Sequence, residues 1–77
     1  MYVTKLSGSY RLVLQKRSAG VWEGLVDGPC PARDPRISIS GLDEAKRALY
    51  EFAEKHFILR GIAEPRIPRQ RIRWNPR

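Results

Sequence analysis

The sequence predicts an α+β domain, in which a small three-stranded antiparallel sheet packs against one α-helix (β-β-β-α) and an extended basic C-terminal tail follows. Three observations predict this class. Two apolar runs flank a loop of hairpin length, a longer segment repeats its apolar residues at the helical period, and six arginines fall in the last 18 residues. We expect residues 1–61 to form the single domain and residues 62–77 the arginine-rich tail.

The first two strands are predicted over residues 10–16 and 21–26. Both runs are rich in leucine, β-branched and aromatic residues. Residues 17–20 between them have the length of a hairpin loop and include a glycine. The run at residues 2–6 fits an additional edge strand.

A third strand is predicted over residues 36–40, where polar and apolar residues alternate. Ile37 and Ile39 would then face inwards and Arg36 outwards. Residues 28–35 contain three prolines, each of which lacks a backbone donor and has a fixed φ. We therefore expect this stretch to be an irregular loop.

The helix is predicted to begin after Ser40 and to end at Gly61. Ser40 is the expected N-cap, with Asp43 at the spacing of a capping box, and Gly61 is a typical C-terminal stop. The apolar face recurs with a period of 3.6 residues and consists of Leu42, Ala45, Leu49, Phe52, Ala53, His56 and Leu59. The remaining side chains of this segment are mixed in charge and slightly acidic, so the helix is a poor candidate for a groove lined by phosphates.

Length and composition exclude several classes of protein. With 77 residues there is room for one domain, and a single cysteine, Cys30, cannot form an internal disulfide. One cysteine and one histidine are too few for a four-ligand zinc site, so we expect no metal and no cofactor. No apolar run has the length of a membrane span, which favours a cytoplasmic protein. His56 is expected to pack in the core, which leaves no base for a nucleophile, and we predict that the protein is not an enzyme.

The position of the positive charge is more informative than its total of +7. Residues 60–77 carry six arginines, no lysine and one acid, whereas residues 1–59 are nearly balanced. Arginine offers a planar fork of donors that matches phosphates and base edges, and it stacks on rings. This bias predicts a nucleic-acid partner, with DNA favoured over RNA.

A two- or three-stranded sheet can enter the major groove, and basic arms track the DNA backbone or minor groove. An extended tail would place Arg69, Arg71 and Arg73 on one side, with Ile72 and Trp74 on the other. The candidate nucleic-acid contacts are therefore Arg11, Lys16, Arg17, Arg36, Arg66, Arg69, Arg71, Arg73 and Trp74.

Two other partners fit the same residues. The chain could be a small regulatory or phage-type protein that binds an acidic protein surface, with Ile67, Ile72 and Trp74 as anchors of the arginine-rich tail. The tail chemistry also suits RNA or the ribosome. Trp74 has two roles open to it, stacking on a base or folding back onto the core, whereas Trp22 is expected to pack under the helix. The sequence is compatible with a monomer and with a homodimer.

Short motifs within residues 10–61 resemble a known family. They are Tyr10-Arg11, Gln15, Gly20-Val21-Trp22, Asp27, Arg36, Ser40-Gly41-Leu42-Asp43-Glu44-Ala45-Lys46-Arg47-Ala48-Leu49-Tyr50 and Leu59-Arg60-Gly61. This set resembles the APETALA/ethylene-response DNA-binding domain, whose relatives include the arm-binding domains of phage tyrosine integrases. The resemblance implies a three-stranded sheet that reads the major groove through arginines and tryptophans.

The sequence departs from that family at several DNA-contacting positions. Leu12 and Leu14 replace a glycine and a base-reading arginine, and Ala19 replaces a tryptophan. Of the family's contacts, Arg11, Lys16 and Arg36 match; these are the positions at which the resemblance implies DNA contact. Alternation along the first strand also permits a second arrangement, with Tyr10, Leu12 and Leu14 facing inwards and Arg11, Val13, Gln15 and Arg17 facing outwards. A short sheet with one helix is similar to HicB-type antitoxin domains as well.

Overall fold

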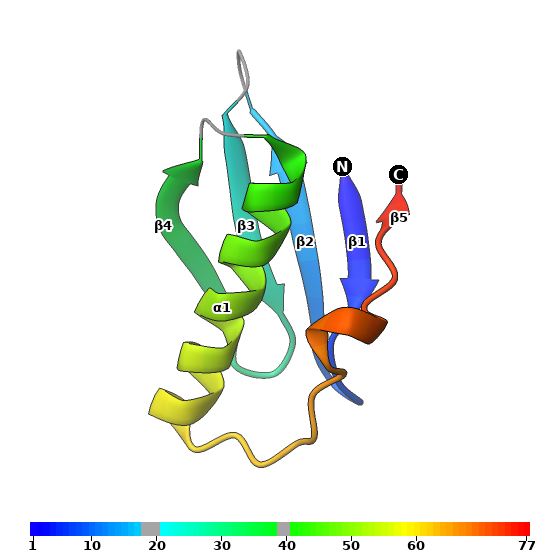
Figure 1. Ribbon diagram of the computed structural model, residues 1–77. Helices are drawn as coiled ribbons and strands as arrows, with labels where there is room; N and C mark the ends of the chain where they lie inside the picture. The colour runs from blue at the N-terminus through cyan, green and yellow to red at the C-terminus, as the bar shows by residue number, and fades with distance from the viewer. Residues whose placement is uncertain (18–20, 39–40) are drawn as a thin grey trace.

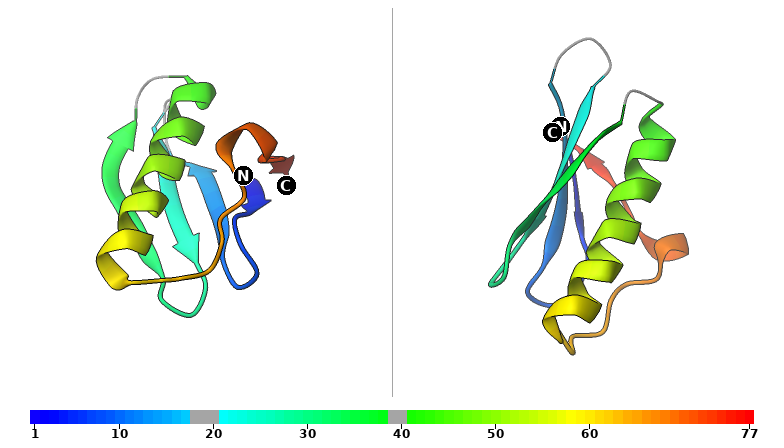
Figure 2. Two further views of the ribbon diagram at one scale, coloured as in Figure 1. Left: turned by 60° about the horizontal axis from the view of Figure 1, so that its bottom comes forward. Right: turned by 90° about the vertical axis from the view of Figure 1, so that its left-hand side faces the viewer.

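One helix lies across one face of an antiparallel sheet in the computed structural model, which describes residues 1–17, 21–38 and 41–77, with the backbone alone at 35–38 (Figure 1; Figure 2). The sheet has the strand order β4-β3-β2-β1-β5. The elements are β1 Tyr2–Lys5, β2 Arg11–Lys16, β3 Trp22–Asp27, β4 Ala32–Ser38, α1 Leu42–Arg60, the 3-10 helix η1 Arg69–Arg71 and β5 Asn75–Pro76. The α+β class and the single helix are confirmed, whereas the prediction of three strands is wrong because the sheet has five.

The two additional strands lie side by side at one edge of the sheet (Figure 1). The edge strand predicted near the N-terminus is present as β1 and pairs with β2. β5 pairs with the other side of β1 through Asn75 and Pro76, and the Arg77 amide donates to the Met1 carbonyl at 2.6 Å. The sequence did not predict β5, because two residues, one of them proline, are too few to show the alternation of a strand. β5 forms because β1 offers it an unpaired backbone edge, and an edge strand tolerates proline.

β4 begins earlier than the strand predicted at 36–40 and contains Pro35. Its pairing with β3 shifts register between Trp22 and Gly24, which marks a bulge or irregularity. β4 is also an edge strand with one neighbouring strand. Pro35, which lacks a backbone N–H, therefore need not remove a hydrogen bond to a second strand. The predicted irregular loop is therefore wrong for its second half.

Part of the predicted third strand and of the helix start lies outside the described residues. Ile39, Ser40 and the loop residues 18–20 are among them, and at Ile37 the backbone alone is described. The predicted inward direction of the two isoleucines consequently stays a prediction. The N-cap of α1 is Gly41, without a side-chain cap hydrogen bond, so the prediction of Ser40 as the N-cap is wrong by one residue.

α1 ends where the sequence predicts, at Gly61, which has the left-handed φ of 64°. The Ile62 amide then donates to the Phe57 carbonyl at 2.9 Å and closes the last turn. The predicted core residue Leu59 is wrong, because its exposed fraction is 83%, whereas Phe57 is buried. These two residues lie about 200° apart around a helix, so only one of them can face the sheet.

The core lies between α1 and the sheet. Its largest fully buried side chains are Phe57, Leu6, Leu12, Leu14, Leu49 and Val26. Leu12 and Leu14 face inwards, so the second of the two predicted arrangements of this strand is the observed one. Gly24 lets α1 approach β3, since a Cβ there would lie 2.7 Å from Leu49 Cδ1. Burial of each large aliphatic side chain contributes about 1.5–3 kcal/mol.

Residues 62–77 fold back along the helix side of the sheet instead of extending away from it (Figure 2). The Ile67 amide donates to the Leu6 carbonyl at 2.7 Å, and the Tyr50 hydroxyl donates to the Ile67 carbonyl at 2.7 Å. The predicted extended alternation is wrong at η1, where the Arg71 amide donates to the Pro68 carbonyl at 2.8 Å. The fixed φ of Pro68 suits the start of such a turn. Within the described residues, no helix combines the length and the apolar character that a membrane crossing requires.

Candidate nucleic-acid interface

His56 is a packed core residue, as predicted. It is buried, and its Nε2 lies 2.7 Å from the carbonyl oxygen of Cys30, to which it donates in the matching tautomer. Its ring stacks on Phe52 with the centroids 6.5 Å apart. Among the described residues, no three His, Cys, Asp or Glu side chains gather closely enough to hold a metal ion.

Two of the predicted sheet contacts, Arg11 and Arg17, carry acidic partners from β3. Arg11 Nε lies 2.7 Å from Asp27 Oδ2, and Arg17 Nε lies 2.6 Å from Glu23 Oε2. Glu23 Oε1 also lies 3.4 Å from Arg33 Nε. The Arg17 hydrogen bond holds the pKa of Glu23 below its ordinary value and raises the pKa of Arg17. These arginines remain more than half exposed, on the sheet face that α1 leaves open.

Lys16 lies on the opposite face of the sheet from Arg11 and Arg17. It follows Leu12 and Leu14 at the inward positions of β2, and its Nζ lies 5.9 Å from the centroid of the Trp22 ring. The structure therefore does not bring the three predicted sheet cations onto one surface. Trp22 packs against the core as predicted and is half-buried.

Arg36 belongs to β4, but its side chain lies outside the described part of the structure. Its predicted contact with nucleic acid stays a prediction.

The tail arginines differ in their surroundings. Arg66 is half-buried, with its Nη2 3.8 Å from Glu54 Oε2 and its guanidinium 5.5 Å from the centroid of the Phe57 ring. Arg69, Arg71 and Arg73 are exposed, and no carboxylate in the described chain lies within 4.0 Å of their nitrogens. Arg66 thus stabilises the attachment of the tail, and the other three are free to meet a ligand.

Trp74 folds back onto the core, which is one of the two roles open to it in the sequence. Its half-buried ring packs beside the core cluster, and Lys46 Nζ lies 6.0 Å from its centroid. The same Nζ lies 5.1 Å from the centroid of Tyr2. Ile67 and Ile72 are half-buried as well, and Ile72 packs against the core, so two of the three expected protein-binding anchors contribute to the chain's own packing.

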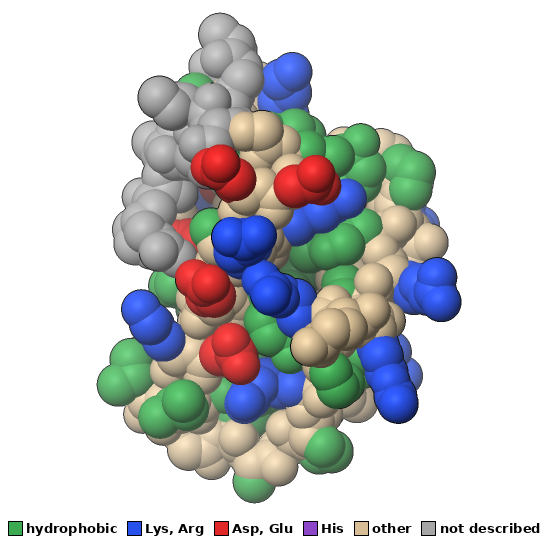
Figure 3. Space-filling model, viewed as in Figure 1, with side chains coloured by type: hydrophobic (Ala, Val, Ile, Leu, Met, Phe, Trp, Pro, Cys, Tyr) green, Lys and Arg blue, Asp and Glu red, His purple; other side chains and the backbone are tan. Residues whose placement is uncertain are grey.

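Basic side chains without acidic neighbours lie at one place on the helix side of the molecule. Figure 3 shows acidic and basic side chains interspersed along α1, and a group of basic side chains beside it, over the C-terminal segment. The acids of α1 are Asp43, Glu44, Glu51 and Glu54. The basic group adjoins η1, whose residues Arg69–Arg71 include two of the free arginines. A polyanion would therefore meet least repulsion over the tail.

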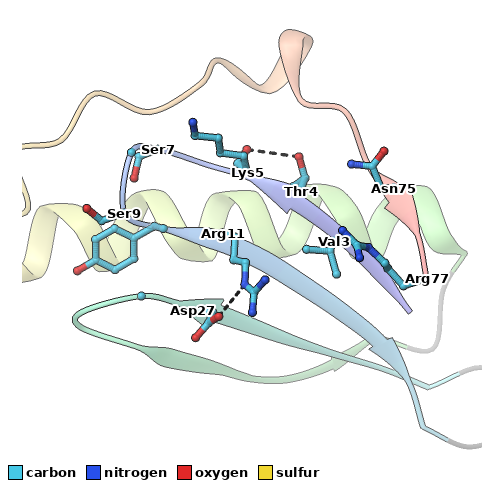
Figure 4. Close-up of a pocket in the computed structure, with 12 residues that line it drawn as sticks. Val3, Thr4, Lys5, Ser7, Ser9, Arg11, Asp27, Asn75 and Arg77 are labelled. Carbon is cyan, nitrogen blue, oxygen red and sulfur yellow. Dashed lines mark hydrogen bonds and ion pairs between the residues drawn. The ribbon is translucent and has the colours of Figure 1, made fainter.

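A hollow of about 420 Å³ opens on the other side of the sheet, over β1, β2 and β5 (Figure 4). The cations that line it are Lys5, Arg11 and Arg77, and Asp27 is its acidic residue. The candidate list from the sequence missed Lys5 and Arg77. Lys5 could have been found, because it is an outward position in the predicted edge strand. Arg77 could not, because only β5 brings the end of the chain to this face.

These surfaces offer cationic donors suited to phosphate. A guanidinium binds a phosphate with two parallel hydrogen bonds, and an exposed ion pair contributes only about 0–1 kcal/mol. Arg17 can therefore exchange its carboxylate for a phosphate at small cost. Comparisons of the chain with protein-family models, curated proteins and solved structures found no match.

Proposed function

We propose that the protein binds nucleic acid, with double-stranded DNA preferred over RNA, through its arginine-rich C-terminal segment and the open face of its sheet. The observation that carries this proposal is the set of three exposed arginines, Arg69, Arg71 and Arg73, which have no acidic partner in the described chain. Their segment is attached to the sheet on both sides, at Ile67 and at Arg77. An attached segment loses less conformational entropy on binding than a free arm.

The geometry of the sheet supports duplex DNA as the ligand. An antiparallel ribbon fits the major groove, and the open face carries Arg11, Arg17 and Arg33. The resemblance to the APETALA/ethylene-response domain, which stays a prediction, favours this same use of a sheet. The acidic side chains of α1 favour the sheet and the tail over the helix as the contact surface.

The alternative of an acidic protein partner has weaker support. Its expected apolar anchors, Ile67, Ile72 and Trp74, are half-buried, and Ile72 and Trp74 pack against the chain's own core. Arginines without accessible apolar neighbours bind a polyanion more readily than they build the packed centre of a protein interface. Nucleic acid therefore remains the preferred partner.

The test is the salt dependence of DNA binding, measured by fluorescence anisotropy with a labelled mixed-sequence duplex. Wild-type affinity should fall linearly as log K against log salt. The variant Arg69→Gln/Arg71→Gln should bind more weakly, with a slope smaller by about 1.8, because each lost phosphate contact removes about 0.9. A flat wild-type plot, or no binding at low salt, would contradict the proposal.

The matched control is Lys55→Gln/Arg60→Gln, which removes the same charge from exposed positions of α1. Its slope should stay close to that of the wild type. Equal loss of slope in both variants would mean that net charge, and not the tail surface, determines binding. A parallel titration with duplex RNA separates the two nucleic acids, and tighter binding to the RNA would reverse the stated preference.

A further inference from the structure

We infer that the hollow over β1, β2 and β5 holds a stretch of the phosphodiester backbone of the bound nucleic acid. This inference rests on the proposed function and narrows its sheet contact to one region of the face opposite α1. Cationic side chains from three elements line the hollow: Arg11 from β2, Lys5 from β1 and Arg77 directly after β5.

The cations outnumber the acids in this hollow, and its one acid already has a partner. Asp27 Oδ2 accepts from Arg11 Nε at 2.7 Å, a contact drawn in Figure 4. Arg11 uses Nε in this hydrogen bond, so its two terminal amino groups remain available. Asp27 thereby acts as a positioning residue, which holds the Arg11 guanidinium over the hollow without occupying its outer edge.

The backbone arranges these cations before any ligand arrives. Lys5 and Arg11 are directly paired in the β1–β2 register. Arg77 is held by the hydrogen bond from its amide to the Met1 carbonyl, at 2.6 Å. Antiparallel neighbours lie about 4.8 Å apart, so β2, β1 and β5 distribute the cations across roughly 10 Å of sheet. An elongated polyanion fits this spread better than a single small anion does.

A neutral donor completes the hollow. The Asn75 amide lines it together with Lys5 and Arg77 (Figure 4). Amide side chains commonly contribute phosphate contacts beside arginine and lysine. Val3 adds a small apolar floor, which suits the sugar that separates two phosphates.

The test compares two charge-matched variants of the full chain. Lys5→Gln/Arg77→Gln removes two cations of the hollow, and the control Lys55→Gln/Arg60→Gln removes two exposed cations of α1, on the other side of the sheet. All four side chains are exposed, and thermal unfolding checks that both variants fold. With a short mixed-sequence duplex, Lys5→Gln/Arg77→Gln (the hollow variant) should reduce the slope of log K against log salt by about 1.8. The control should reduce this slope by less.

A spectroscopic readout identifies the site itself. In the wild type, the Nε–Hε NMR signals of Arg11 and Arg77 should shift on addition of the duplex, and the Arg11 shift should shrink in Lys5→Gln/Arg77→Gln. If the wild type binds DNA through Arg69 and Arg71 while the hollow variant binds with unchanged slope and shifts, the inference is overturned and the proposed function stands. Absence of duplex binding by the wild type overturns both. Shifts with inorganic phosphate but none with the duplex would assign the hollow to a free anion and overturn the inference.

Discussion

At the scale of single residues, two positions, one of them a glycine, determine how other elements pack around the sheet. Gly24 is buried beneath α1, where the fully buried Leu49 leaves no room for a methyl group. Glu64 acts at the opposite end of the sheet. One of its oxygens accepts from the Ser7 hydroxyl and from the Ser9 amide, both at 2.8 Å, and so holds the turn between β1 and β2.

Gly24→Ala is expected to destabilise the fold by about 1–3 kcal/mol, because the added methyl group overpacks a filled core. The measurement is denaturant unfolding followed by circular dichroism. Gly8→Ala is the control, since a Cβ at Gly8 has Glu64 Oε1 as its nearest neighbour, at an ordinary 3.5 Å. Equal free energies of unfolding for the Gly24 variant and the wild type would show that the Leu49 side chain moves aside without loss of stability, contrary to this prediction.

Glu64→Gln is expected to lower stability in a pH-dependent way. Hydrogen bonds from the Ser9 hydroxyl, and then from the Ser7 hydroxyl and the Ser9 amide, hold the pKa of Glu64 below its ordinary value. A carboxyl whose pKa is lower in the folded state stabilises the fold above its unfolded pKa, and it loses this effect as the pH falls through the folded pKa. Thermal melts should therefore separate the variant from the wild type at neutral pH and converge in acid.

The control for that series is Glu51→Gln, which removes an exposed carboxylate from α1. At neutral pH its melting temperature should stay close to that of the wild type, because this carboxylate is exposed. A Glu64 variant whose difference from the wild type is the same at pH 7 and in acid would contradict the role assigned to the ionised carboxylate.

At the scale of elements, the attachment of the C-terminal segment to α1 depends on a few directed contacts. The Tyr50 hydroxyl binds the Ile67 carbonyl, and Arg66 covers the Phe57 ring. Trp74 packs beside Lys46 further along. Because β5 has only two residues, these side chains must supply much of what holds it against β1.

Tyr50→Phe is expected to cost about 1 kcal/mol, the usual contribution of one hydrogen bond with a partly buried partner. Amide hydrogen exchange should accelerate at Ile67 and at Arg77, whose N–H groups bond the first residues of the chain. Tyr2→Phe is the matched control, because it removes a hydroxyl without a recorded hydrogen bond in the described structure. Unchanged exchange at both amides in Tyr50→Phe would contradict this account.

At the scale of the whole molecule, residues 62–77 have two functions that can be separated. Their arginines supply most of the excess positive charge, and their apolar residues Ile62, Ile72 and Trp74 are half-buried against the core. A chain of this size has a thin core, so the loss of these contacts matters.

Removal of residues 62–77 is expected to destabilise the remaining chain by about 3 kcal/mol, from the apolar burial of three half-buried side chains. Denaturant unfolding of the shortened and full chains gives the difference. The charge control is Arg69→Gln/Arg71→Gln/Arg73→Gln in the full chain, which should retain near wild-type stability because these side chains are exposed. A shortened chain as stable as the full one would show that the segment adds charge alone.

Local pattern was sufficient for much of the fold and for part of the candidate interface. The period of the apolar residues predicted α1, and Gly61 predicted its end, because both depend on neighbours within one or two turns. Alternation predicted that Arg11 and Leu12 face opposite sides of β2, and composition alone located the tail arginines. The pattern of apolar residues could not decide whether Leu59 or Phe57 faces the sheet at the end of the helix, because both residues are apolar.

Contacts between distant residues decided the rest. The partner of Arg77 is Met1, the pairing of Asp27 with Arg11 follows from the β2–β3 register, and the burial of Trp74 requires α1 beside it. None of these has a signal within a short window of sequence, since strand pairing depends on which backbone edges remain free once the sheet has formed. The sequence therefore specifies a basic α+β chain, whereas tertiary packing decides which cations are paired, which are free and which share a surface.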